Sequence, residues 1–167
     1  NGTDTTDNCG VCDSDSSNDC IEDCTGEWGG HSVCIEIDNI DSTEGSIDII
    51  YASNDPISGF QFDITGISII GASSNLGDVF TSSGSSLVLG IATNGDSANG
   101  DSLPAGSGVL VTVNFAPPLI DIQSCLSDIL IGYSGGVVYP VSNLIDCVII
   151  PSLSPLSNLT SIIATSG

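Results

Sequence analysis

Strict alternation of apolar and polar residues dominates the chain from residue 33 onward. In the clearest stretch, Gly59–Gly66, Phe60, Phe62 and Ile64 alternate with polar residues, and a glycine stands at each end. A period of two between turn residues is typical of a strand with one face on a core and the other in water. No window combines a helical period with capping signals, so the pattern predicts an all-β domain.

The alternating pattern recurs every 8–14 residues or so, with Gly, Pro, Asn and Asp between the repeats. We therefore expect roughly nine strands in a jelly-roll-like antiparallel β-sandwich. We assign residues 33–150 to this sandwich and expect a polar loop over residues 73–78. The expected strands lie within residues 33–38, 47–51, 59–66, 67–72, 87–92, 109–115, 129–132, 137–141 and 144–150.

The first 30 residues are rich in Asp, Asn, Ser, Gly and Cys and nearly lack large aliphatic side chains. Such a segment cannot bury a core of its own, so cross-links or a metal must hold it. Zinc bound by four cysteines and disulfides in an oxidising compartment are both compatible with the spacing. The acidic surroundings and the additional cysteines downstream favour disulfides. We assign residues 1–32 to a loop-rich, disulfide-stapled arm.

The number of cysteines is odd. They are Cys9, Cys12, Cys20, Cys24, Cys34, Cys125 and Cys147. We expect Cys125 to pair with Cys147, since a loop of about 20 residues closed in this way stabilises by about 3 kcal/mol. Five cysteines then remain, so one is free or pairs with another chain. Cys34, at the junction, is the expected odd residue, and an exchange of partners with Cys147 stays open.

The order of Cys, Asp and Gly in the arm resembles a known repeat. Residues 7–20 read DNCGVCDSDSSNDC and residues 22–30 read EDCTGEWGG. The two stretches together resemble the Cys/Asp-rich repeats of secreted microbial surface proteins, which are distantly similar to thrombospondin type 3 repeats. The resemblance implies bound calcium, with Asp side chains and cysteines alternating around the ion.

Four acids in this stretch are our candidate calcium ligands: Asp13, Asp15, Asp19 and Asp23. Short carboxylates on a tight turn can converge on one hard cation. The stretch is not an EF-hand, because Asn18 stands where that loop needs Gly and Cys24 stands where it needs an acid. The alternative is a solvated acidic loop held by disulfides, with Trp28 capping the arm or packing on the sandwich.

Residues 35–150 resemble cohesin-type domains and related carbohydrate-binding-module-like sandwiches of microbial surface proteins. Three strand patterns carry the resemblance: GFQFD at 59–63, SLVLG at 86–90 and PAGSGVL at 104–110. The resemblance implies a nine-strand jelly roll whose relatives bind partner proteins and have no enzymatic activity. It assigns no binding face to particular residues.

Residues 151–167 start as a proline-containing linker and end in Leu159–Thr165, which reads as a further strand. This strand either folds back onto its own sheet or pairs with the edge of a neighbouring copy, giving a head-to-tail chain of subunits. Sequons at Asn1 and Asn158 are candidate glycosylation sites. No signal-like segment stands at the start, so we expect a mature or excised product from which any export signal has been removed.

The charge balance excludes several kinds of partner. The chain has 21 Asp and Glu, no Lys or Arg, and a net charge of −21. Nucleic acids and anionic membranes need cationic side chains, so neither is an expected partner. Distance, salt or bound cations must relieve the repulsion between these acids, and the resemblance of the arm makes calcium the expected cofactor. His31 is the only basic side chain, and we expect it to be exposed.

Candidate catalytic groups are missing from the sequence. One His without a metal-spaced partner argues against a triad or a zinc hydrolase, and no phosphate-binding Gly-rich loop with Lys is present. Apolar runs are too short to span a membrane. We expect a non-enzymatic, secreted structural module of a cell-surface filament or adhesive assembly. The alternative is a monomeric recognition module that binds a partner protein or a glycan.

Overall fold

The computed structural model describes residues 5–10, 12–13, 19–82, 84–92, 102–133 and 136–153. Within these ranges the protein is all-β, and no helix is long and apolar enough to cross a membrane. The strands are β1 (Thr5–Thr6), β2 (Cys12–Asp13), β3 (Val33–Asp41), β4 (Ser46–Ser53), β5 (Gly59–Ile64), β6 (Ile69–Ser73), β7 (Gly77–Thr81), β8 (Leu87–Ala92), β9 (Gly106–Phe115), β10 (Ile122–Tyr133), β11 (Val137–Tyr139), β12 (Val141–Ile145) and β13 (Cys147–Ile150).

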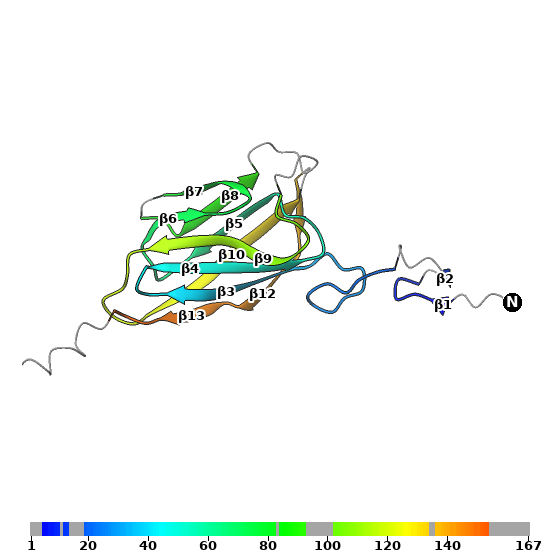
Figure 1. Ribbon diagram of the computed structural model, residues 1–167, viewed down its shortest axis with the longest axis horizontal. Helices are drawn as coiled ribbons and strands as arrows, with labels where there is room; N and C mark the ends of the chain where they lie inside the picture. The colour runs from blue at the N-terminus through cyan, green and yellow to red at the C-terminus, as the bar shows by residue number, and fades with distance from the viewer. Residues whose placement is uncertain are drawn as a thin grey trace, which may run out of the picture.

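Two sheets pack against each other and form a sandwich (Figure 1). The β4 sheet has the order β12-β3-β4-β9-β6, and the β5 sheet has the order β11-β10-β5-β8-β7, with β13 also paired to β10. Strand β12 runs parallel to β3, and the other pairs in both sheets are antiparallel. The predicted β-sandwich is confirmed.

The core lies between the sheets and comes from the alternation seen in the sequence. In β5, Phe60, Phe62 and Ile64 are buried while the intervening residues are only partly covered. Burial removes apolar surface from water at about 25 cal/mol per Å², which makes these rows the main source of stability. The packing is close: a Cβ at Gly90 would overlap the Phe60 ring, so β8 has a glycine beneath that ring.

The structure differs from the predicted strands at several places, among them Pro140, where the expected strand 137–141 breaks between β11 of one sheet and β12 of the other. Part of the expected loop at 73–78 belongs to β7, an edge strand in which only Val79 is partly buried, so its apolar signal is weak. Strand β10 begins at Ile122 rather than near residue 129. Its first part was not predicted because Ser124, although fully buried, is polar and interrupts the apolar pattern. The expected strand 144–150 breaks at Asp146, where the chain passes from the β4 sheet to the β5 sheet.

Three disulfides are present among the described residues: Cys9–Cys20, Cys24–Cys34 and Cys125–Cys147. The expected Cys125–Cys147 pair is confirmed, and it joins directly opposite positions of β10 and β13. The prediction that Cys34 is the odd cysteine is wrong. Cys34 is the second residue of β3, where the arm meets the sheet, and it bonds Cys24 of the arm. Such bridges indicate an oxidising compartment.

The seventh cysteine is Cys12, whose side chain lies outside the described part of the structure. The expected terminal strand at 159–165 and the sequons at Asn1 and Asn158 also lie outside the described residues. These assignments stay predictions.

Candidate interaction surfaces

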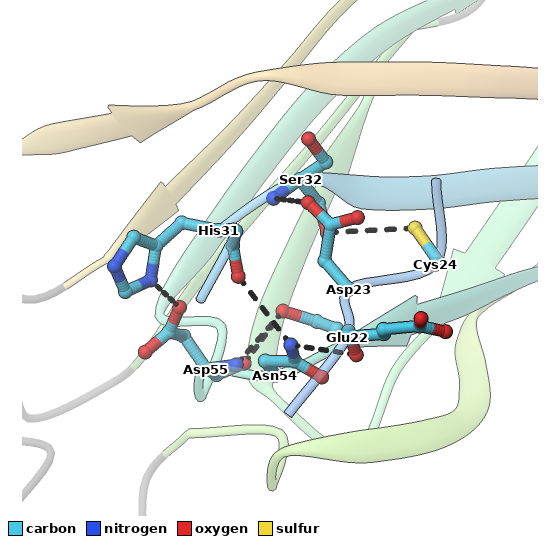
Figure 2. Close-up of polar contacts among 9 residues, drawn as sticks. Glu22, Asp23, Cys24, His31, Ser32, Asn54 and Asp55 are labelled. Atoms are coloured by element: carbon cyan, nitrogen blue, oxygen red, sulfur yellow. Dashed lines mark hydrogen bonds and ion pairs between the residues drawn. The ribbon is translucent and has the colours of Figure 1, made fainter. Parts of the chain in front are cut away.

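The Asp23 carboxylate organises the part of the arm that precedes β3. Its Oδ1 accepts hydrogen bonds from the Thr25 backbone N at 2.9 Å, the Thr25 hydroxyl at 2.6 Å and the Glu27 backbone N at 3.1 Å. Its Oδ2 accepts one from the Ser32 backbone N at 3.0 Å (Figure 2). These donors, the Thr25 hydroxyl first, lower the pKa of Asp23. The side chain is therefore a charged anchor for the turn from residue 23 to residue 32.

The two glycines after Trp28 have different structural roles beside this anchor. Gly29 has a φ of +68°, a conformation that non-glycine residues rarely adopt. A Cβ at Gly30 would overlap the Asp23 carboxylate. Gly29 of this pair is thus required by its backbone conformation, and Gly30 by the close approach of the chain to Asp23.

The arm is fastened to the loop between β4 and β5. The Asn54 side chain donates to the carbonyl oxygens of Glu22 at 3.0 Å and of Gly30 at 3.4 Å. His31 Nδ1 lies 2.5 Å from Asp55 Oδ2, and this hydrogen bond raises the pKa of His31 (Figure 2). The His31 side chain is 66% exposed, as expected. Together with the Cys24–Cys34 disulfide, these contacts attach residues 21–32 to the sandwich.

The four candidate calcium ligands are not brought together in the part of the chain that is described. Asp15 and the side chain of Asp13 lie outside it, Asp19 is exposed, and both carboxylate oxygens of Asp23 accept hydrogen bonds from its own turn. Among the described residues, no group of three or more His, Cys, Asp or Glu is arranged to hold a metal ion. Calcium binding stays a prediction.

A cleft of about 610 Å³ lies between the arm and the β10–β11 hairpin. Its arm side consists of Glu27, Gly29, Gly30, His31 and Ser32, together with Asp55. Its hairpin side consists of Tyr133, Val137, Val138, Tyr139 and Pro140. The two tyrosine rings are 6.1 Å apart, and burial raises the pKa of Tyr139 to about 12, so its hydroxyl stays protonated near neutral pH.

A second surface is the outer face of the β5 sheet. The register places Phe80 of β7 opposite Leu89 of β8, Leu89 opposite Gln61 of β5, and Gln61 opposite Leu130 of β10. This row crosses four strands, and its ends, Phe80 and Leu130, are 51% and 50% exposed. We use the name apolar face for the apolar residues of this row and their apolar neighbours on the same side, namely Phe80, Leu87, Leu89, Ile91 and Leu130; Gln61 is the polar member of the row.

Acidic residues flank the apolar face. Asp63 lies opposite Leu87, and Asp78 lies opposite Ile91. The outer face of the β4 sheet is more polar at its centre, where Asp48 accepts hydrogen bonds from Thr112 at 2.6 Å and from Asn39 at 3.1 Å. Both outer faces carry exposed apolar side chains: on the β4 sheet, Val109 and Ile145 are 40% and 42% exposed. The apolar face differs in having the aromatic Phe80 half exposed at its edge.

A third surface is the loop between β9 and β10. Leu119 and Ile120 are 89% and 72% exposed, the highest values for large apolar side chains within the described ranges. The loop is held where the chain leaves β13: the Leu153 backbone N donates to the Pro118 carbonyl at 3.3 Å, and the Ser152 backbone N donates to Asp121 at 2.8 Å. These contacts fix an apolar projection, which we call the end loop (residues 116–120).

Comparison with solved structures identifies the architecture. A non-cellulosomal cohesin from the hyperthermophilic archaeon Archaeoglobus fulgidus is similar at 16% identity and a TM-score of 0.53, over 74% of this chain and 92% of that one. CaCohA2 from Clostridium acetobutylicum gives 11% identity and a TM-score of 0.53, with 74% and 92% covered. The same cohesin in a complex with CaDoc0917 is similar at 10% identity and a TM-score of 0.52, over 72% of this chain and 99% of that one.

The protein has a cohesin-like fold. No family model and no curated protein matches the chain, and at these identities the likeness to solved structures shows the fold alone. The expected cohesin-like β-sandwich is confirmed. The calcium-repeat resemblance of the arm stays a prediction.

Sequence reasoning missed the surfaces of this cohesin-like sandwich for two reasons. Phe80 and Leu130 are about 50 residues apart in sequence, and only the strand order places them in one row. The cleft depends on how the arm is attached to the β4–β5 loop, which no periodicity encodes. A usable signal did exist for the end loop: two prolines followed by two large aliphatic residues, directly after the alternating stretch 109–115.

Proposed function

We propose that this protein is a non-enzymatic, extracellular protein-binding module of a cell-surface assembly. The observation that carries the proposal is the apolar face, where Phe80 and Leu130, each about half exposed, and Leu89 lie in one row across the sheet, with the polar Gln61 of β5 between Leu89 and Leu130. Contiguous apolar patches on soluble proteins commonly mark interaction sites. A cohesin of the same fold, CaCohA2, is described in a complex with CaDoc0917, which supports a protein partner.

Charge defines the chemistry of the partner. The chain has a net charge of −21, and Asp63 and Asp78 lie on the rim of the apolar face. The complementary surface is an apolar ridge flanked by Lys or Arg. Steering by such charges is screened by salt, with a Debye length of about 8 Å at physiological ionic strength. Binding at the apolar face is therefore expected to weaken as salt rises.

The test uses variants of the exposed ends of the row. Immobilised wild type, Phe80→Asp, Leu130→Asp and a matched control, Val109→Asp, are exposed to the secreted proteins of the source cells. Val109 is 40% exposed on strand β9 of the other sheet, so the control makes the same change elsewhere. A protein retained by wild type and the control is purified, and its Kd is measured by calorimetry at two salt concentrations.

A loss of about 30-fold or more in affinity for each face variant, the size of a hot-spot effect, supports the proposal. Equal binding by all four proteins, or a partner whose binding strengthens with salt, contradicts it.

A second candidate function is a subunit of an extracellular filament. The observation that favours it is the placement of the cleft and the end loop at opposite ends of the sandwich. A surface and its complement at opposite ends make a heterologous contact, which propagates into an open chain. Electron microscopy of the native protein tests this function: filaments support it, and compact monomers at every concentration contradict it.

A further inference from the structure

We propose that the end loop of one copy, with Leu119 and Ile120 at its tip, inserts into the cleft between the arm and the β10–β11 hairpin of the next copy. The proposed junction rests on the filament role proposed above and names its contact surfaces. The partner at the cleft is thus a second copy of this chain.

The geometry prevents a copy from filling its own cleft. The end loop immediately precedes β10, and Tyr133, the last residue of β10, lines the cleft. A strand of 12 residues spans roughly 36 Å at about 3.3 Å per residue, so the two surfaces are separated by the length of the sandwich. Figure 1 shows the arm at one end and the last residues of β13 at the other.

The end loop is built as a preformed projection. Pro117 and Pro118 restrict the backbone, and the Leu153 backbone N donates to the Pro118 carbonyl. Little conformational freedom is left to lose on docking, which favours binding. The cleft volume of about 610 Å³ lies within the usual range for a small-molecule site, roughly 300–1,000 Å³, and so has room for two aliphatic side chains.

Charge favours this pair of surfaces over others for contact between two copies. Each copy has a net charge of −21, so two copies repel wherever acids meet. The end loop has no charged residue, and neither does the stretch 130–145, which includes the residues on the hairpin side of the cleft. Val137 and Val138 there are 55% and 58% exposed, which makes them apolar partners for the loop.

Charged groups border the contact on both sides. Glu27, Asp55 and His31 line the arm side of the cleft, and Asp121 follows the end loop. The acids outnumber the single histidine, so the junction is expected to tighten as salt screens their repulsion. This salt dependence is opposite to that expected for a cationic partner at the apolar face, so one titration distinguishes the two proposals.

The experiment uses the full chain and two complementary variants. Leu119→Asp changes the end loop and leaves the cleft intact, whereas Val137→Asp changes the cleft and leaves the loop intact. Ile70→Asp, at a residue 69% exposed on β6, is the matched control. All four proteins are compared by sedimentation velocity and electron microscopy at 50 and 500 mM NaCl, after an unchanged thermal transition has shown that each is folded.

We expect wild type and the Ile70→Asp control to form chains that lengthen with protein and salt concentration. Each complementary variant alone is expected to stay monomeric, with association weakened about 30-fold or more. An equimolar mixture of the two is expected to stop at the heterodimer, because one intact loop then meets one intact cleft.

Several outcomes would overturn the proposal. Chains that persist in both variants are made by another contact, such as the 159–165 segment or an intermolecular disulfide that reductant releases. A mixture without heterodimer, or a monomeric wild type at all salt concentrations, also contradicts it. If filaments form as predicted but Phe80→Asp still binds its partner protein, the junction is supported and only the proposed role of the apolar face is refuted.

Discussion

The sandwich and the arm are stabilised by different kinds of interaction. The sandwich contains a continuous apolar core, with side chains such as Phe62 and Phe115 fully buried between two sheets. Within residues 19–32 of the arm, the only buried residue is the charged Asp23. The sandwich is therefore stabilised by the removal of apolar surface from water, and the arm by hydrogen bonds to one carboxylate and by disulfides.

Because of this difference, we expect the two regions to unfold independently of each other. A cavity in the core weakens the sandwich and everything attached to it. Loss of a hydrogen bond or bridge in the arm releases the arm and leaves the sandwich folded, because few side chains connect the two. The predictions below test this independence.

The largest effect is expected in the core. Phe62→Ala removes a fully buried ring of β5 and should lower the free energy of unfolding by about 3–5 kcal/mol. Chemical denaturation followed by circular dichroism measures the change. Phe80→Ala, at a half-exposed position, should cost far less, and equal losses for the two variants would refute the assignment of Phe62 to the core.

The next effect concerns the disulfide within the sandwich. Replacing both Cys125 and Cys147 with Ala opens a loop with a sequence separation of 22 and should cost about 3 kcal/mol. The same denaturation experiment measures it. The arm's exchange protection should be unchanged under native conditions, and selective release of the arm in this variant would contradict the independence of the two regions.

A smaller effect, confined to the arm, is expected at Gly30. A Cβ there overlaps the Asp23 carboxylate, so Gly30→Ala should displace it and expose the amides of residues 25, 27 and 32 to exchange. The global unfolding free energy should change by less than about 0.5 kcal/mol. Gly71→Ala, where a Cβ meets nothing within 4 Å, is the control. A large global loss for Gly30→Ala would show that the arm is part of the core.

The smallest effect is the pH dependence of arm docking. The hydrogen bond to Asp55 raises the pKa of His31, so the ion pair is fully present below the ordinary His pKa of about 6.5. Its contribution is lost as pH rises through the raised value, and for so exposed a pair it is below about 1 kcal/mol. Exchange protection of residues 28–32 should therefore decrease from pH 6 to pH 9. His31→Gln should remove this dependence, and an increase with pH would contradict the assignment.

The sequence predicted the sandwich because its strands place their apolar residues at every second position, as Phe60, Phe62 and Ile64 do. The prediction failed at positions where a polar side chain is buried or an apolar side chain is exposed. Ser124 is fully buried but polar, and Phe80 is large and apolar but half exposed. The role of Asp23 was not predictable, because a calcium ligand and an anchor for backbone amides have the same sequence signal. The surfaces depend on contacts between segments distant in sequence.

The most direct test of the central claim is amide exchange of the native protein and of the double variant Cys24→Ser/Cys34→Ala, measured by mass spectrometry. The account predicts that residues 21–32 lose protection in the variant, while β4, β5 and β9 keep the protection seen in the wild type. Simultaneous loss in the arm and in these three strands would contradict the claim that the arm and the sandwich are stabilised separately.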